Sequence, residues 1–178
     1  MRTDDVASIH IPVVGIISAP QDRELRDQLV AHLAVLVQAG MLRVWHEGCV
    51  GAGDDYRAVL THGLDQARLI VVLISADLFA SEQLDPDLLR ALQRQQSGHT
   101  IVMSVVAKTC LWDASPLSAQ SVLPVGRKRI TAWKDRNAGW TAVVAAIRNW
   151  LLGNDDQKKP RVFHRCNSRS MTFMQPPG

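Results

Sequence analysis

Residues 69–75 most strongly limit the folds that are open to this chain. They read Leu-Ile-Val-Val-Leu-Ile-Ser, with six consecutive apolar positions that are rich in β-branched side chains. A strand that is apolar on both faces must be covered on both faces, which is typical of a parallel sheet between two layers of helices. The run therefore predicts a central strand of an α/β domain.

Further strands and helices are predicted on both sides of this run. Apolar, β-branched segments predict strands at residues 11–18, 41–45 and 100–107, and a short fifth strand at residues 129–133. Amphipathic spacing predicts helices over residues 22–40, 56–67, 86–96 and 138–152. This alternation predicts a flavodoxin-like α/β fold, a five-stranded parallel sheet of order 2-1-3-4-5 with helices on both faces.

The predicted strand order also indicates where a ligand would bind. In such a sheet, ligands bind beyond the carboxyl ends of strands one and three, where the chain reverses direction. Those ends lie at residues 18–22 and 75–77, and the glycine-rich loop at residues 48–53 borders the same edge. An acidic cluster follows on this rim, formed by Asp77, Glu82, Asp85 and Asp87. Helix capping is the alternative explanation for Asp85 and Asp87, which flank Pro86 at a predicted helix N-terminus.

The distribution of charge divides the chain into an arm, a domain and a tail. We expect an N-terminal arm at residues 1–10, one folded domain at residues 11–152, and a basic, disordered tail at residues 153–178. The tail contains five of the 20 basic residues and two of the 17 acidic ones, so the rest of the chain is neutral. The pI of about 9.0 therefore belongs to the tail, and no nucleic-acid partner is expected for the domain.

Several classes of site are not supported by the sequence. The phosphate-loop pattern GxxxxGK[ST], the dinucleotide pattern GxGxxG and the hydrolase pattern GxSxG are all missing. His46, Glu47 and Cys49 lie within four residues without a second pair of ligands, so no metal site is expected. Three widely spaced cysteines favour a reducing, cytoplasmic setting. No apolar run has the length of a signal peptide or a membrane span, and no membrane partner is expected.

Six short motifs resemble the Toll/interleukin-1 receptor (TIR) domain, specifically its bacterial type. Residues 45–47 (WHE) and 53–56 (GDDY) are similar to that family's "WHD…PGDDW" loop, called the BB loop. Five further segments follow in the family's order. Residues 69–81 resemble "IILLVSPDFLAS", residues 90–98 resemble "RALERHEAG", and residues 110–112 resemble "PCDW". The last two segments, residues 123–124 and 130–140, together resemble "LP…VTSW.NRDEAW". The resemblance spans residues 13–152, and six motifs in order are more specific than any one of them.

The resemblance implies the flavodoxin-like fold and two family activities. Many bacterial TIR domains cleave the nicotinamide–ribose bond of NAD+, and others act mainly by homotypic association with further TIR domains. Cleavage uses a carboxylate beside the ribose that stabilises an oxocarbenium-like transition state. The implied catalytic residue here is Asp87. The implied nucleotide-binding residues are Ser18, Asp22, Trp45, Ser75 and Asp77, and the implied interaction residues of the BB loop are His46, Glu47, Gly48, Cys49 and Gly53.

The sequence departs from the family pattern at the implied site. Asp87 stands where the family has glutamate, residues 17–22 (ISAPQD) replace "SYSHKD", and Gly48, Cys49 and Ala52 replace Arg, Asp and Pro in the BB loop. A carboxylate that is one methylene shorter is costly, because misplacement by about 1 Å can slow a reaction on the order of 100-fold. We therefore expect a signalling or defence module that associates with other TIR domains and has a degenerate NAD+ site. The alternative is an active NAD+ glycohydrolase that uses Asp87, with NAD+ as substrate and no bound cofactor.

Overall fold

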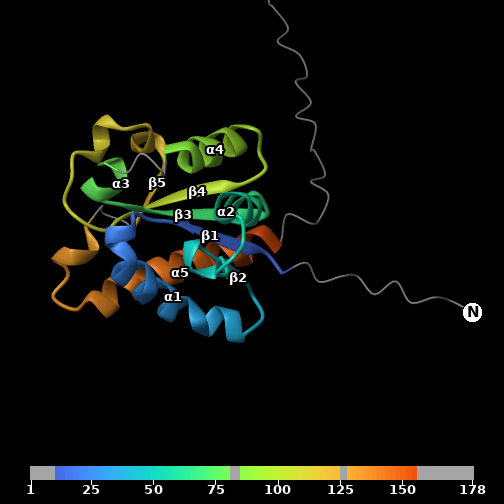
Figure 1. Cartoon of the computed structure of the whole chain (residues 1–178). Helices are drawn as coiled ribbons and strands as arrows, with labels where there is room; N and C mark the ends of the chain where they lie inside the picture. Colours follow the sequence, from blue (N-terminus) through green and yellow to red (C-terminus); the bar gives the residue numbers. More distant parts are fainter. Residues whose placement is uncertain (1–10, 81–84, 125–127, 156–178) are drawn as a thin grey trace, which may run out of the picture.

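The computed structural model describes residues 11–80, 85–124 and 128–155 (Figure 1). Five strands form one parallel sheet: β1 (Val13–Ile17), β2 (Arg43–Trp45), β3 (Ala67–Ile74), β4 (Ile101–Val106) and β5 (Ser121–Leu123). Their order across the sheet is β2-β1-β3-β4-β5, so the predicted fold class and strand order are confirmed. The predicted arm at residues 1–10, the tail beyond residue 155 and Glu82 lie outside the described residues.

Helices cover both faces of the sheet (Figure 1). On one face lie α1 (Arg23–Gln38) and α5 (Arg136–Asp155), and on the other lie α2 (Tyr56–Asp65), α3 (Ala76–Ala80) and α4 (Asp85–Gln96). Along β3, Leu69, Val71 and Leu73 pack with α1 and α5. The alternate residues Ile70, Val72 and Ile74 pack in the second core, with α2 and α4. This alternation explains why the strand is apolar at consecutive positions.

The prediction of a fifth strand at residues 129–133 is wrong. β5 is formed by residues 121–123, where Ser121 lies beside Met103 of β4. Residues 130–132 form instead a turn of 3-10 helix, η5 (Ile130–Ala132), which buries Ile130 completely. Ile130 and Trp133 are three positions apart, and a 3-10 helix places residues with that spacing on the same side. Both contact α5 where Gly139 leaves room, so this apolar pattern belongs to a helical turn.

Three features of the fold position the loops that form the candidate site. β1 and β3 end beside each other, and α3 begins two residues after β3. The connection from β2 to α2 contains a short 3-10 helix, η2 (Glu47–Cys49). α4 packs beside α2 on the same face of the sheet. Within the described part of the chain, no helix is long and apolar enough to cross a lipid bilayer.

Candidate functional site

A buried polar cluster occupies the carboxyl ends of β1 and β3. Asp22 and Ser75 are almost completely buried, and the Ser75 hydroxyl donates a short hydrogen bond to Asp22 Oδ2. Ser75 Oγ also accepts a hydrogen bond from the backbone N–H of Leu78, at 3.1 Å, and so stabilises the first turn of α3. A buried carboxylate needs partners, and Asp22 finds them at the strand ends where the sequence predicted a site.

Lys108 completes this cluster from the end of β4. Its ammonium lies 2.6 Å from Asp22 Oδ1 and 3.0 Å from Asp77 Oδ2. Hydrogen bonds to Asp22, and then to Asp77, raise the pKa of Lys108. Three of the predicted nucleotide-binding residues, Asp22, Ser75 and Asp77, are therefore joined with Lys108 in one network of hydrogen bonds and ion pairs. The sequence analysis missed Lys108, although its place just after β4 puts it at the same edge of the sheet.

Asp87 reaches from α4 across to α2. Its carboxylate Oδ2 lies 3.2 Å from Nη1 of Arg57, and the Thr61 hydroxyl also donates a hydrogen bond to it. The Asp87 side chain is 5% exposed, whereas that of Arg57 is 49% exposed. Burial raises the pKa of the Asp87 carboxyl, and the nearby charge of Arg57 and the bond from Thr61 offset part of that rise. Asp87 is thus a buried carboxylate with one partner that is open to solvent.

Asp87, Ser18 and Glu47 line one small cavity. The rest of its wall is apolar and comes from Ile16, Ile17, Leu60 and Leu64. The Ser18 hydroxyl is buried and has no hydrogen-bond partner among the described residues. A buried polar atom without a partner is costly, and such atoms often meet water or a ligand. The cavity has a volume of about 10 Å³, which is no more than one water molecule needs.

Glu47 lines both this cavity and a second, open hollow of about 350 Å³. Its carboxylate Oε1 lies 2.5 Å from Nη1 of Arg26, a side chain of α1 that is itself buried. The Arg26 guanidinium also binds Asp27, with 2.8 Å between Nη2 and Oδ1. Tyr56 donates a long hydrogen bond of 3.5 Å to Glu47 Oε2. The β2–α2 loop is therefore attached to α1 through one carboxylate.

Side chains within the β2–α2 loop determine its local shape. His46 Nδ1 accepts a hydrogen bond from the backbone N–H of Gly48 at 3.0 Å. Asp54 accepts one from Gly51 at 3.1 Å, and Asp55 caps α2 by accepting one from Ala58 at 3.2 Å. Desolvation, and then the charge of Arg26, lowers the pKa of His46, which favours the neutral ring that can accept. The loop is thus held by its own polar side chains.

The tip of this loop is open to solvent. Gly48, Cys49 and residues 51–58 are all exposed. Gly53 has a φ of +97°, a left-handed conformation that side chains other than glycine rarely adopt. Among the described residues, no group of three or more histidine, cysteine, aspartate or glutamate side chains is placed to hold a metal ion.

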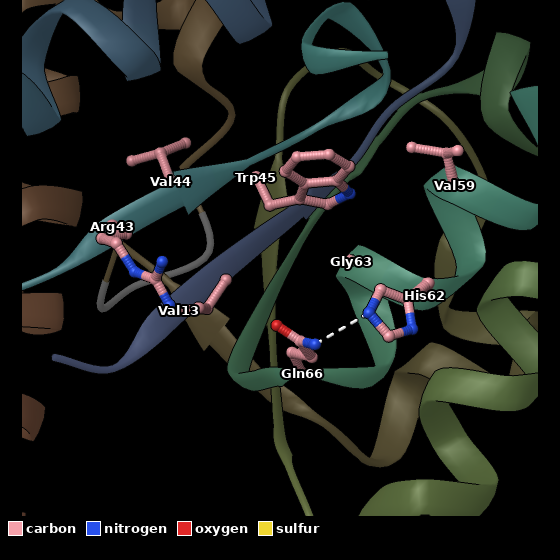
Figure 2. Close-up of a pocket in the computed structure, with 8 residues that line it drawn as sticks. All are labelled: Val13, Arg43, Val44, Trp45, Val59, His62, Gly63 and Gln66. Atoms are coloured by element: carbon pink, nitrogen blue, oxygen red, sulfur yellow. Dashed lines mark hydrogen bonds between the residues drawn. The ribbon is translucent and has the colours of Figure 1, made fainter. Parts of the chain in front are cut away.

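Trp45 lies apart from the other predicted site residues. Its side chain is partly buried between β2 and α2, and it lines a separate hollow with His62, Gly63 and Gln66 (Figure 2). Its indole N–H donates a hydrogen bond of 3.3 Å to the carbonyl of Leu60. The structure thus brings Ser18, Glu47 and Asp87 together at one cavity, ties Asp22, Ser75 and Asp77 to Lys108, and keeps Trp45 in a different place.

The comparison with solved structures matches the TIR domain of the Toll-related receptor TRR-2 from Hydra magnipapillata, with a TM-score of 0.53. The match covers 76% of this chain and 98% of that domain, at 18% identity. The chain has the fold of a TIR domain. The β2–α2 connection, residues 46–55, is therefore the BB loop of this TIR fold.

Sequence comparison finds a longer relative of this TIR-like domain. The chain is 32% identical over 139 residues to the uncharacterized protein y4lF of Sinorhizobium fredii (strain NBRC 101917 / NGR234). The match covers 78% of this chain but only 43% of the relative, so the chain spans less than half of that protein's length. No protein-family model matches the chain.

Proposed function

We propose that this chain acts as a TIR-domain module that associates with other TIR domains through the BB loop at residues 46–55. The observation that supports this most strongly is the contrast between the two sides of the loop. Its outer side is preformed and exposed, whereas the cavity behind it, beside Asp87, has a volume of only about 10 Å³. A loop that is already ordered loses little conformational entropy when a partner binds.

Ala52 offers a direct test of association through this loop. It is exposed in the loop, so Ala52→Glu adds a charge without removing a contact of the core. We expect the wild-type protein to self-associate in sedimentation velocity over a hundredfold range of concentration, and Ala52→Glu to weaken association by about tenfold or more. Ala145→Glu is the matched control, because Ala145 is exposed on α5. A monomeric wild type at every concentration, or equal effects of both variants, would contradict the proposal.

A second function, hydrolysis of NAD+, is favoured by the residues that meet at the small cavity. Asp87, Glu47 and the unpartnered hydroxyl of Ser18 line the same space. In this proposal Asp87 orients the ribose hydroxyls and stabilises the positive charge that develops as the nicotinamide leaves. Sites for ligands of this size have volumes of roughly 300–1,000 Å³. The loop must therefore move first, and Glu47 of this loop lines both the cavity and the open hollow.

Nicotinamide release tests this second function. The wild-type protein, clustered on a surface to bring copies together, is incubated with NAD+ beside Asp87→Ala, Asp87→Glu and the control Asp113→Ala. Asp113 is exposed and lies outside the cavity wall. If the enzyme proposal holds, Asp87→Ala abolishes release, Asp113→Ala does not change it, and Asp87→Glu retains or increases it. If neither the wild type nor Asp87→Glu releases nicotinamide, only association remains as the proposed function.

The setting of this module is also part of the proposal. Cys49 and Cys110 are both free thiols, which supports a reducing compartment such as the cytoplasm. A TIR domain that is matched to less than half of a longer relative can serve as the association unit of a larger signalling or defence protein. In this proposal, association of the TIR domains is the event that changes the activity of the larger protein.

A further inference from the structure

The hollow between β2 and α2 is distinct from the Asp87 cavity (Figure 2). It has a volume of about 230 Å³ and shares no lining residue with the Asp87 cavity or with the open hollow beside Glu47. The hollow lies where the edge strand β2 meets the side of α2, and neither the BB-loop proposal nor the NAD+ proposal uses it. A dinucleotide is too large for this volume, whereas one or two fused rings fit.

One wall of this hollow is the indole ring of Trp45, and the ring is held firmly in place. Trp45 packs directly on Gly63 of α2, where a Cβ atom would come within 2.0 Å of the indole nitrogen. The indole N–H donates to the Leu60 carbonyl at 3.3 Å. Because its only donor is already used, the ring offers the hollow an apolar, aromatic surface, and Val59 adds a further apolar wall. Such a surface favours stacking with a planar, apolar group.

Farther along β2, two residues before Trp45, the wall of the hollow is positively charged. Arg43, on β2, lines it and is exposed. Among the described residues, Arg43 has no ion-pair partner within 4.0 Å, and none of the residues that line the hollow is acidic. His62 and Gln66, whose side chains are joined by a hydrogen bond of 2.9 Å, close a third side. A guanidinium and an aromatic ring that line the same small hollow suit a ligand that is planar at one end and anionic at the other.

We propose that this hollow binds a small planar carboxylate, with the ring against Trp45 and the carboxylate on the guanidinium of Arg43. Trp45 is already in position, because Gly63 and the Leu60 carbonyl fix its ring. Arg43 supplies a planar donor that matches the two oxygens of a carboxylate. This site does not depend on the proposed association or on NAD+ cleavage at Asp87, because Trp45 and Arg43 line neither the Asp87 cavity nor the open hollow beside Glu47.

The test uses the full chain and 2-naphthoate as the probe, with uncharged 2-naphthamide as its isosteric comparator. Isothermal titration calorimetry is expected to give a Kd for 2-naphthoate of about 1 mM or below, as is usual for a ligand of this size. The amide is expected to bind about tenfold more weakly. Arg43→Gln should weaken naphthoate binding about tenfold, whereas Arg148→Gln, which changes an exposed arginine of α5, should leave it unchanged.

A second readout locates the bound probe. In protein labelled with 5-fluorotryptophan, 2-naphthoate should shift the fluorine resonance of Trp45, which is assigned with Trp45→Phe. The proposal is overturned if the wild type does not bind naphthoate at about 5 mM, five times the highest Kd expected for a ligand of this size. Equal affinity for the amide, equal affinity of Arg43→Gln and wild type, or a shift confined to the other tryptophans would also overturn it.

Discussion

The guanidinium of Arg57 lies 3.2 Å from the carboxylate of Asp87, and this contact joins α2 to α4 across the rim of the small cavity. Asp87 is buried and Arg57 is half exposed. The residue that the family resemblance identifies as catalytic is therefore neutralised by a side chain that can move into solvent. A ligand that needs the carboxylate must compete with Arg57, so this ion pair links the stability of the domain to access to its site.

Arg57→Gln should reduce the free energy of unfolding by about 1 kcal/mol at neutral pH, because it leaves a buried carboxylate with fewer partners. Thr61 still donates to Asp87, which limits the loss. Urea denaturation measures the change, with Arg148→Gln as the control. In the double variant Arg57→Gln/Asp87→Asn the loss should disappear, because no buried charge remains. Losses that simply add in the double variant would show that the two side chains do not interact.

Asp87→Asn should raise the melting temperature at pH 7 by about 1–3 °C. Burial raises the pKa of Asp87 in the folded protein, so the folded state holds its proton to a higher pH than the unfolded state does. Stability from this group is fully present below its ordinary pKa and is lost as pH rises through the raised value. Calorimetry should therefore show a higher melting temperature for Asp87→Asn than for the wild type at pH 7, and no difference between them near pH 4. Asp113→Asn should show no such trend, and a variant that is less stable at pH 7 would contradict the argument.

Glu47→Gln should loosen the BB loop from α1. It removes one charged partner of Arg26, whose buried guanidinium then keeps Asp27 alone among the described acidic residues, and we expect a loss of about 2 kcal/mol. Hydrogen exchange should become faster across residues 46–55 and remain unchanged in β3. Glu24→Gln is the control, because Glu24 is exposed and its contact with Arg136 is 3.7 Å long, and such surface pairs contribute little. Unchanged exchange in the loop of Glu47→Gln would show that Arg26 does not hold it.

Gly63→Ala should destabilise the domain by about 2–3 kcal/mol, because the new methyl group collides with the indole of Trp45. Thermal denaturation measures the loss, and near-ultraviolet circular dichroism should report the displaced ring. Gly153→Ala makes the same change in α5 where nothing lies within 4 Å, and it should stabilise the helix by about 0.5–1 kcal/mol. The opposite signs of the two substitutions are the result that tests the packing of Trp45 on Gly63.

The sequence predicted the elements that have strong local patterns and missed those that do not. The apolar run in β3 is recognisable in the sequence because this strand is buried on both faces. The helices α1 and α5 are recognisable because each is buried on one face, which makes every third or fourth residue apolar. β5 has only three residues, too few for a periodicity. Residues 130–133 looked like a strand because Ile130 and Trp133 are apolar, but their spacing of three suits the observed 3-10 turn.

The position of Asp22, Ser75 and Asp77 at the carboxyl edge of the sheet could be predicted, but their partners could not. Asp22, Ser75 and Asp77 follow strands, so their position at the carboxyl ends could be inferred. The sequence did not show that Lys108 lies between two carboxylates or that Arg57 lies beside Asp87. Each of these contacts depends on how separate elements pack. No local pattern shows which of several charged residues on a helix faces a neighbouring helix.

The sequence by itself determined the fold class and the strand order, and it placed Asp22, Ser75 and Asp77 at the carboxyl edge of the sheet. Burial of one face of an element gives neighbouring residues a periodic apolar pattern, and parallel strands joined by helices permit few topologies. Only the tertiary structure decided that Glu47 is tied to Arg26, that the cavity beside Asp87 is small, and that Trp45 lies on Gly63 in a hollow of its own. These features depend on distances between side chains far apart in the chain, which the packing of helices on the sheet establishes.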